Sequence, residues 1–145
     1  MNEFEIVTRI ERPREVVFAA ITAAENIPAW TPGLEEVLVA GRPLGPGTEM
    51  TFIGRFLGRR YESVSECVAL EPGVRFATAS RSGPFHLEVE QTLRSEGEVT
   101  VLTSHYQGDS RAFFKLAEPI VLHLARRLFE SANANLKALI EADAL

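Results

Sequence analysis

Cysteine is almost absent from this chain of 145 residues, since Cys67 is the only one. One cysteine excludes an internal disulfide framework and is typical of a reducing compartment. A single thiol is more often a small hydrophobic side chain than a reactive nucleophile. The first residues lack the basic region and apolar core of a signal peptide, and no apolar run approaches the ~18 residues of a membrane span. We therefore expect a cytoplasmic protein without stable membrane insertion.

An excess of positive charge is also missing, because the formal net charge is −5 at pH 7. This balance disfavours nucleic acids and anionic membranes as partners. The phosphate loop G-x-x-x-x-G-K-[ST], the zinc helix H-E-x-x-H and the nucleophile elbow G-x-S-x-G are absent as well. We therefore expect neither a cofactor nor a metal. The length and the 46% of hydrophobic residues predict one domain, residues 1–145.

What the sequence does contain is a long amphipathic stretch at residues 113–142. At the α-helical period, one broad arc carries Phe113, Phe114, Ala117, Ile120, Val121, Leu124, Ala125, Leu128, Ser131, Ala132, Asn135, Leu136 and Leu139. We expect this arc to be buried, and the opposite arc, with Arg126, Glu130 and Asn133, to face solvent. Pro119 lacks a backbone donor, so it predicts either a kink or a helix that restarts near this residue.

The chain before this stretch alternates between strand and turn signals. A half-buried strand at residues 3–11 precedes a helix that begins at Pro13 and a short helical piece at residues 24–30. Six further strands are predicted at residues 34–40, 50–56, 61–70, 75–81, 85–93 and 98–107. Strands spaced this evenly, with tight connections, indicate an antiparallel meander. The predicted fold class is therefore α+β, with about seven strands, two short helices between the first two strands, and a long final helix.

The last two strands carry most of the polar side chains that we expect inside. If Leu93 pairs with Glu98, one face is mainly apolar. That face carries Phe85, Leu87, Val89, Gln91, Thr100, Leu102, Ser104 and Tyr106. The other face places His86 opposite His105, a pair that lacks the closed ligand set of zinc. With His123 on the polar arc of the long helix, all three histidines point outward and the interior lacks the usual general base.

Two strands are ambiguous in which face they bury. In residues 61–70, one set of side chains is the more apolar but includes Glu62, and the other contains Tyr61 and small residues. An inward Glu62 would place in the interior a carboxylate whose pKa burial would raise, which suits acid–base chemistry. In the next strand, we expect Phe76 to point inward and Arg81 to lie near the rim.

Four local patterns carry a resemblance to a known family. They are ERPREVVFAAIT, AENIPAWTPG, VALEPGVRF and LKALIEA, in this order along the chain. With the order of elements, they make nearly the whole chain resemble the START-like, Bet v 1-like helix-grip superfamily (SRPBCC), in its polyketide cyclase/dehydrase branch. The resemblance implies a helix-grip fold, in which a curved antiparallel sheet wraps the long helix around an apolar cavity. Members bind lipids, sterols, polyketides, quinones or plant hormones, and a minority are enzymes.

The resemblance and the absent catalytic signatures favour binding or carriage of a small hydrophobic ligand (lipid, polyketide, isoprenoid or aromatic) by a monomer or homodimer. Such a role requires a cavity of at least ~300 Å³. The expected ligand-binding residues are Trp30, Phe52, Phe56, Phe76, Phe85, Leu87, Gln91, Leu102, Ser104, Tyr106, Phe113, Ala117, Val121 and Leu124. We expect the cavity entrance between residues 110–118 and the turns at residues 43–47 and 82–84.

The alternative is an enzyme, most simply a polyketide cyclase, aromatase or dehydratase. Such chemistry needs a proton donor or acceptor beside a bound carbonyl group. The candidate catalytic residues are Tyr106, Ser104 and Glu62. Whether Glu62 or Tyr61 shares the cavity with Tyr106 decides whether this alternative survives.

Overall fold

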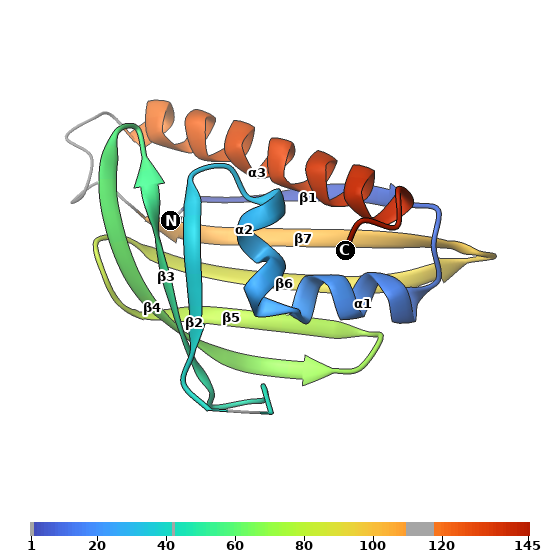
Figure 1. Cartoon of the computed structure of the whole chain (residues 1–145). Helices are drawn as coiled ribbons and strands as arrows, with labels where there is room; N and C mark the ends of the chain where they lie inside the picture. Colours follow the sequence, from blue (N-terminus) through green and yellow to red (C-terminus); the bar gives the residue numbers. More distant parts are fainter. Residues whose placement is uncertain (1, 42, 110–117) are drawn as a thin grey trace.

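A computed structural model describes residues 2–41, 43–109 and 118–145 of the chain. Its seven-stranded antiparallel sheet has the order β1-β7-β6-β5-β4-β3-β2. The strands are β1 (Asn2–Ile10), β2 (Leu34–Val39), β3 (Glu49–Phe56), β4 (Arg59–Glu71), β5 (Arg75–Ser82), β6 (His86–Glu96) and β7 (Val99–Asp109). The sheet curls around the long helix, as Figure 1 shows, so the predicted helix-grip fold is confirmed.

The described helices lie on the concave side of the sheet (Figure 1). Helix α1 (Arg14–Thr22) follows Pro13, whose extended backbone forms the N-cap. A 3₁₀ turn η1 (Ala24–Asn26) leads into α2 (Ile27–Trp30), and α3 (Glu118–Glu141) ends the fold. Pro119 is the second of the described residues of α3. The kink predicted before Pro119 falls on residues 113–117, outside the described residues.

The hydrophobic core lies at the end of the fold where α1 and the C-terminal half of α3 meet the sheet. Fully buried side chains there include Ile10, Val17, Ile21, Met50, Leu102 and Leu136. Burying each stabilises the fold by roughly 1.5–3 kcal/mol relative to exposure. A second, smaller cluster gathers Val121 with Phe56, Tyr61 and Phe85 near the start of α3.

The register predicted for the β6–β7 hairpin is wrong by four residues. Leu93 pairs with Leu102, and the strands continue to a tight turn in which Glu96 faces Val99. Gly97, at φ +63°, takes the first position of a two-residue turn that suits the twist of a hairpin. Because a four-residue shift is even, the same side chains still point inward.

The two histidines of the hairpin do not pair. His86 lies opposite Asp109, and His105 lies opposite Glu90. The His105 imidazole instead approaches the Glu3 carboxylate at 3.2 Å across β1 and β7. The cross-strand histidine pair expected from the predicted register is therefore wrong.

The buried face of α3 also differs from the predicted arc. Asn133, expected in solvent, is 2% exposed, whereas Ser131 and Asn135, expected inside, are exposed. A helical wheel places every asparagine on the polar side because it contains no information about hydrogen-bond partners on other elements. Here β7 supplies two, Ser104 and Tyr106, and their hydrogen bonds compensate for the burial of Asn133.

Candidate functional site

A cavity of about 240 Å³ lies between the sheet and the N-terminal half of α3. The requirement of at least ~300 Å³ that was set above for a ligand pocket is therefore not met, and the space is limited to a ligand smaller than that requirement assumed. A dry cavity of ~150 Å³ is known to hold benzene, so the observed space suits a molecule of about two fused rings. The wall is mainly apolar and includes the aromatic side chains of Phe4, Trp30, Phe52, Phe56, Phe76, Phe85 and Phe129.

Helix α3 forms the apolar wall of the cavity. The contributing side chains are Val121, Leu122, Ala125, Leu128 and Phe129. They recur at the spacing of one helix face, so the amphipathic pattern that buries the helix also lines the cavity. The small side chain of Ala125 leaves room at the middle of this wall.

Three stacked aromatic rings fix α3 to the sheet beside the cavity. The Tyr106 and Phe129 ring centroids lie 4.1 Å apart with nearly parallel planes, and the Phe4 centroid lies 5.2 Å from that of Tyr106 and 6.3 Å from that of Phe129. The Arg126 guanidinium lies 5.5 Å from the Phe4 centroid and covers the stack. Strands β1 and β7 and helix α3 therefore meet in one rigid unit.

The hydroxyl group of Tyr106 belongs to a buried polar network. The Asn133 side-chain amide donates to the Tyr106 oxygen at 3.0 Å and to the Phe129 carbonyl at 2.8 Å. Ser104 donates to the Asn133 amide oxygen at 3.2 Å. Burial raises the pKa of Tyr106, and its hydrogen bonds with Asn133 and Ser104 oppose the rise. The network thus keeps the phenol neutral and uses it to hold α3.

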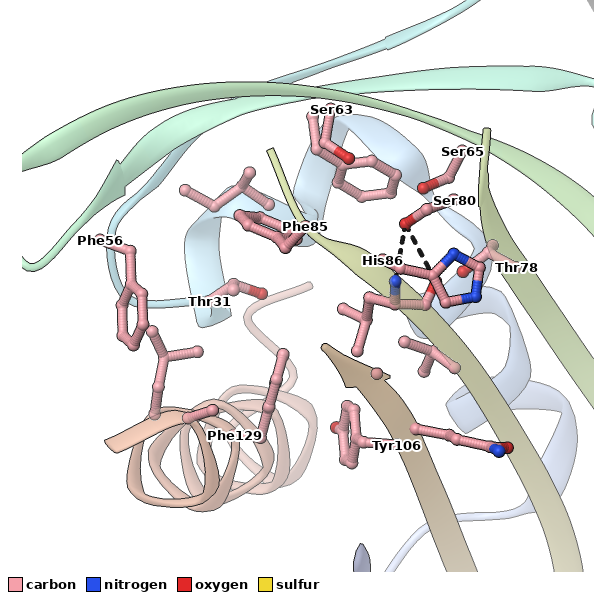
Figure 2. Close-up of a pocket in the computed structure, with 18 of the residues that line it drawn as sticks. Thr31, Phe56, Ser63, Ser65, Thr78, Ser80, Phe85, His86, Tyr106 and Phe129 are labelled. Atoms are coloured by element: carbon pink, nitrogen blue, oxygen red, sulfur yellow. Dashed lines mark hydrogen bonds between the residues drawn. The ribbon is translucent and has the colours of Figure 1, made fainter. Parts of the chain in front are cut away.

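The opposite wall, on the sheet, carries small polar side chains. Figure 2 shows Ser63, Ser65 and Ser80 on one side of the pocket and Phe129 on the other. Thr78 and Gln91 extend this wall over β5 and β6. The phase left open for β4 is thereby settled, because Tyr61, Ser63 and Ser65 line the cavity.

Tyr61 is the second phenol in the cavity. Its ring meets Phe85 edge-on with centroids 5.3 Å apart. Burial raises the pKa of Tyr61, and the negative charge of Glu35 raises it further. The group is therefore a protonated hydrogen-bond donor at neutral pH.

A surface hollow at the β5–β6 turn adjoins the cavity. Ser80, Phe85, His86 and Asp109 line both spaces, and residues 81–84 complete the hollow. This supports the expectation that the turn at residues 82–84 frames the entrance. The turn at residues 43–47 lines neither space, so its expected part in the entrance is wrong. The third expected element, residues 110–118, falls almost wholly outside the described residues.

Most of the predicted ligand-binding residues line the cavity. Those that do are Trp30, Phe52, Phe56, Phe76, Phe85, Leu87, Gln91, Tyr106 and Val121. Leu102 and Ser104, both 0% exposed, lie in the packed interior, and Leu124 does not line the space. Phe113 and Ala117 lie outside the described residues. Arg81 lies at the hollow, where its guanidinium pairs with Glu66 at 3.1 Å.

The three candidate catalytic residues are not brought together in the cavity. The Glu62 side chain is exposed on the other face of β4, so an inward carboxylate is excluded there. Ser104 is buried behind the cavity wall, and the Tyr106 hydroxyl is held by Asn133. Tyr61 does share the cavity with Tyr106, so the test set for the enzyme alternative leaves Tyr61 as its one candidate.

The sequence reasoning missed several residues of the wall. They include Phe4, Tyr61, Ser63, Ser65, Thr78, Ser80, His86 and Phe129. His86, predicted to point outward, reaches the cavity mouth where β6 begins. The alternation of β1 already marked Phe4 as inward, and one of the two open phases of β4 contained Tyr61, Ser63 and Ser65. The wheel omitted Phe129 because it placed the buried arc too far round α3.

The described part of the chain shows neither a metal site nor a reactive thiol. No group of three histidine, cysteine, aspartate or glutamate side chains there is arranged to hold a metal ion. Burial raises the pKa of the Cys67 thiol, which keeps it in the unreactive neutral form. None of the helices in residues 2–41, 43–109 and 118–145 is both long and apolar enough to cross a membrane.

The family model described as polyketide cyclase/dehydrase and lipid transport matches residues 1–141. The chain belongs to this family. No curated protein matches its sequence. The helix-grip fold and the cavity between sheet and helix thus occur in a chain that fits the family model over nearly its whole length.

Solved structures with the same fold cover nearly all of the chain. A protein from Thermus thermophilus is 20% identical, with a TM-score of 0.85 over 99% of this chain and 100% of that one. A START superfamily protein from Mycobacterium smegmatis is 15% identical, with a TM-score of 0.83 over 97% of both chains. The Zhui aromatase/cyclase from a Streptomyces species is 15% identical, with a TM-score of 0.77 over 99% of this chain and 93% of that one. At these identities the similarity establishes the fold alone.

Proposed function

We propose that the protein binds or carries a small hydrophobic molecule in the cavity between the sheet and α3. The observation that carries the proposal is the cavity itself, about 240 Å³ in volume and walled by aromatic and aliphatic side chains. A core of this size normally packs without voids larger than a water molecule, so an apolar space of this volume is unusual unless something fills it. The volume favours a compact ring system over a long lipid chain.

The titratable groups of the cavity also support binding over chemistry. The Tyr106 phenol is held in a structural network, and Glu62 lies on the outer face of the sheet. Of the residues that the structure describes, only His86 and Asp109 bring ionisable imidazole or carboxylate groups to the wall, and both also line the surface hollow. A general acid and base placed deep beside a bound carbonyl would be needed for most cyclase or dehydratase steps.

The proposal is tested by filling the cavity with a side chain. Ala125→Phe places a ring in the middle of the α3 wall and should weaken naphthalene binding at least tenfold in a calorimetric titration. Ala138→Phe, on the exposed face of the same helix, is the matched control and should bind like the parent. Trp30, the only tryptophan, lines the cavity and should report occupancy by a change in its emission.

Native mass spectrometry of the freshly purified protein should show a co-purifying molecule of matching size. No binding of naphthalene to the parent, with no molecule co-purifying, would refute the proposal. Equal binding by Ala125→Phe and Ala138→Phe would move the ligand out of this cavity.

A cyclase-type enzyme is the second candidate, and Tyr61 is the observation that favours it. Its neutral phenol lies in the cavity beside Phe85 and is able to donate a hydrogen bond to a ketone, which polarises the carbonyl group. Incubation with a short poly-β-ketone should then give a cyclised product by mass spectrometry, and Tyr61→Phe should lose it. If the parent protein leaves the poly-β-ketone unchanged, the cyclase candidate is refuted.

A further inference from the structure

The sheet wall of the cavity carries polar groups that the protein itself does not satisfy. Ser65 is 7% exposed and Gln91 is 6% exposed, and both line the cavity. Within residues 2–41, 43–109 and 118–145, neither side chain makes a hydrogen bond. Among the described residues, the side-chain polar atoms that are fully buried without a partner are instead Trp30 Nε1 and Thr31 Oγ1, which also line the cavity. Buried hydroxyl, amide and indole N–H groups are almost always paired, so these four side chains are available to an occupant of the cavity.

Neighbouring hydroxyls show the contrast. Ser80 donates to the Leu87 carbonyl and accepts from the Leu87 N–H, both at 3.0 Å, and so continues the ladder where β5 and β6 separate. Ser63 donates to the Ser82 carbonyl at 3.4 Å. The Ser63 and Ser80 hydroxyls thus bond to the backbone of the sheet, whereas the Ser65 and Gln91 side chains make no hydrogen bond within it.

The unsatisfied groups of the sheet lie on adjoining strands and form one strip. Ser65 lies opposite Ser80 on β5, and Thr78 lies two residues further along the same strand. Gln91 lies opposite Phe76 on the other side of β5. We call Ser65, Thr78 and Gln91 the polar strip. The α3 wall across the cavity is wholly apolar, whereas the sheet wall combines apolar side chains with the polar strip (Figure 2). The unpaired Trp30 and Thr31 groups lie at a third place, the end of α2.

The charge of the wall restricts what the polar strip recognises. Among the described residues, no lysine, arginine or glutamate lines the cavity, and the one carboxylate, that of Asp109, is at the mouth. An anionic ligand group would be desolvated there without a counter-charge. Serine and threonine hydroxyls and a glutamine amide both donate and accept, which matches a hydroxyl or carbonyl group.

We infer that the cavity takes a compact, largely aromatic molecule with a neutral hydroxyl or carbonyl group on one edge. That edge lies against the polar strip, and the apolar face lies against α3. The inference rests on the proposed function, namely that the cavity holds a small hydrophobic ligand. It adds the chemical class and the orientation of that ligand.

Three bicyclic probes test the inference by calorimetric titration: naphthalene, 2-naphthol and 2-naphthoate. Partition from water alone would make naphthalene bind better than 2-naphthol. We expect the reverse, with 2-naphthol binding at least tenfold tighter and 2-naphthoate weakest of the three. Gln91→Leu and Ser65→Ala should each reduce the advantage of 2-naphthol to about threefold or less while keeping naphthalene binding. Thr92→Val, the next residue on β6 and outside the cavity wall, should keep the full advantage.

The outcomes separate the inference from the function on which it rests. Naphthalene binding with no advantage for 2-naphthol, or an advantage that survives both variants, overturns the inference and leaves the proposed function standing. No binding of any probe overturns the proposed function. Ser65→Ala is a small change, so it keeps the test available if Gln91→Leu does not fold.

Discussion

The two halves of α3 share one amphipathic pattern but face different surroundings. In the C-terminal half, Ala132, Leu136 and Ile140 are nearly inaccessible and belong to the main core. In the N-terminal half, Ala125 and Leu128 face the cavity. The difference shows that the same helix provides stability where packing is complete and a binding wall where it is not.

The closed half is also tied down at its end. Arg12 donates to the Glu141 carbonyl at 2.6 Å, and the Glu11 N–H donates to the Glu141 carboxylate at 2.8 Å. Arg12 further pairs with Asp143 at 3.2 Å. Exposed pairs of this kind contribute little individually, but they satisfy the last turn of α3. The tight packing and these contacts explain why the opening lies at the other end.

Paired leucine truncations on α3 give the largest expected effect. Leu136→Ala removes a side chain that is 0% exposed in close packing and should cost about 3–5 kcal/mol of unfolding free energy. Leu128→Ala removes the same atoms beside an existing cavity and should cost about 1–2 kcal/mol. Urea unfolding of both variants measures the difference.

The effects of the two variants on ligand affinity should be in the opposite order to their effects on stability. Leu128→Ala enlarges the cavity and should change naphthalene affinity, whereas folded Leu136→Ala should bind like the parent. Equal stability losses would mean that the N-terminal half is packed as tightly as the C-terminal half, and the comparison would fail.

Much of the fold was predictable because period and turn chemistry act locally. The β6–β7 hairpin shows both the reach and the limit of such reasoning. The inward-facing side chains of β6 and β7 were predicted correctly, because the alternation of apolar residues determines them. The register was predicted wrongly, because the prediction placed a four-residue loop where the chain forms a two-residue turn at Gly97. The strip of Ser65 and Gln91 depends on which strands adjoin, and so it becomes visible only in the folded chain.

Asn133 marks where the sequence pattern and the structure disagree most, and its removal should have the next largest effect. Asn133→Ala removes the partner that ties the buried Ser104 and Tyr106 hydroxyls to α3 and leaves them only each other, so it should cost about 1–3 kcal/mol of unfolding free energy. Ser131→Ala, on the exposed side, is the control and should change stability by less than about 0.5 kcal/mol. The predicted wheel implies the opposite order, so urea unfolding of the two variants decides between them.

The two tyrosines predict a loss of stability at alkaline pH. Burial raises the pKa of both Tyr61 and Tyr106 above that of a free phenol, which is ~10. The unfolded chain therefore loses its phenolic protons first, so this stability is complete below pH ~10 and declines as pH rises through the folded pKa values. Phenolate absorbance of Tyr61→Phe reports Tyr106 alone, because the chain has only two tyrosines. Phenolate formation at or below pH ~10 in the folded variant would contradict the burial argument.

The β3–β4 turn offers the smallest effect and a way to change the open end without touching the cavity wall. Leu57 is 47% exposed and has φ +53°, a left-handed conformation that disfavours leucine, and Gly58 follows at φ +79°. Asn-Gly is the preferred pair for such a turn, so Leu57→Asn should raise the unfolding free energy by about 0.5–1 kcal/mol. Gly58→Ala meets no neighbouring atom but keeps the positive φ, so it should have the opposite sign. Thermal unfolding and naphthalene titration of both variants should show stability shifts without a change in affinity. A fall in affinity with Leu57→Asn would show that the turn itself closes on the ligand, and the open end would then owe its shape to Leu57 as well as to α3.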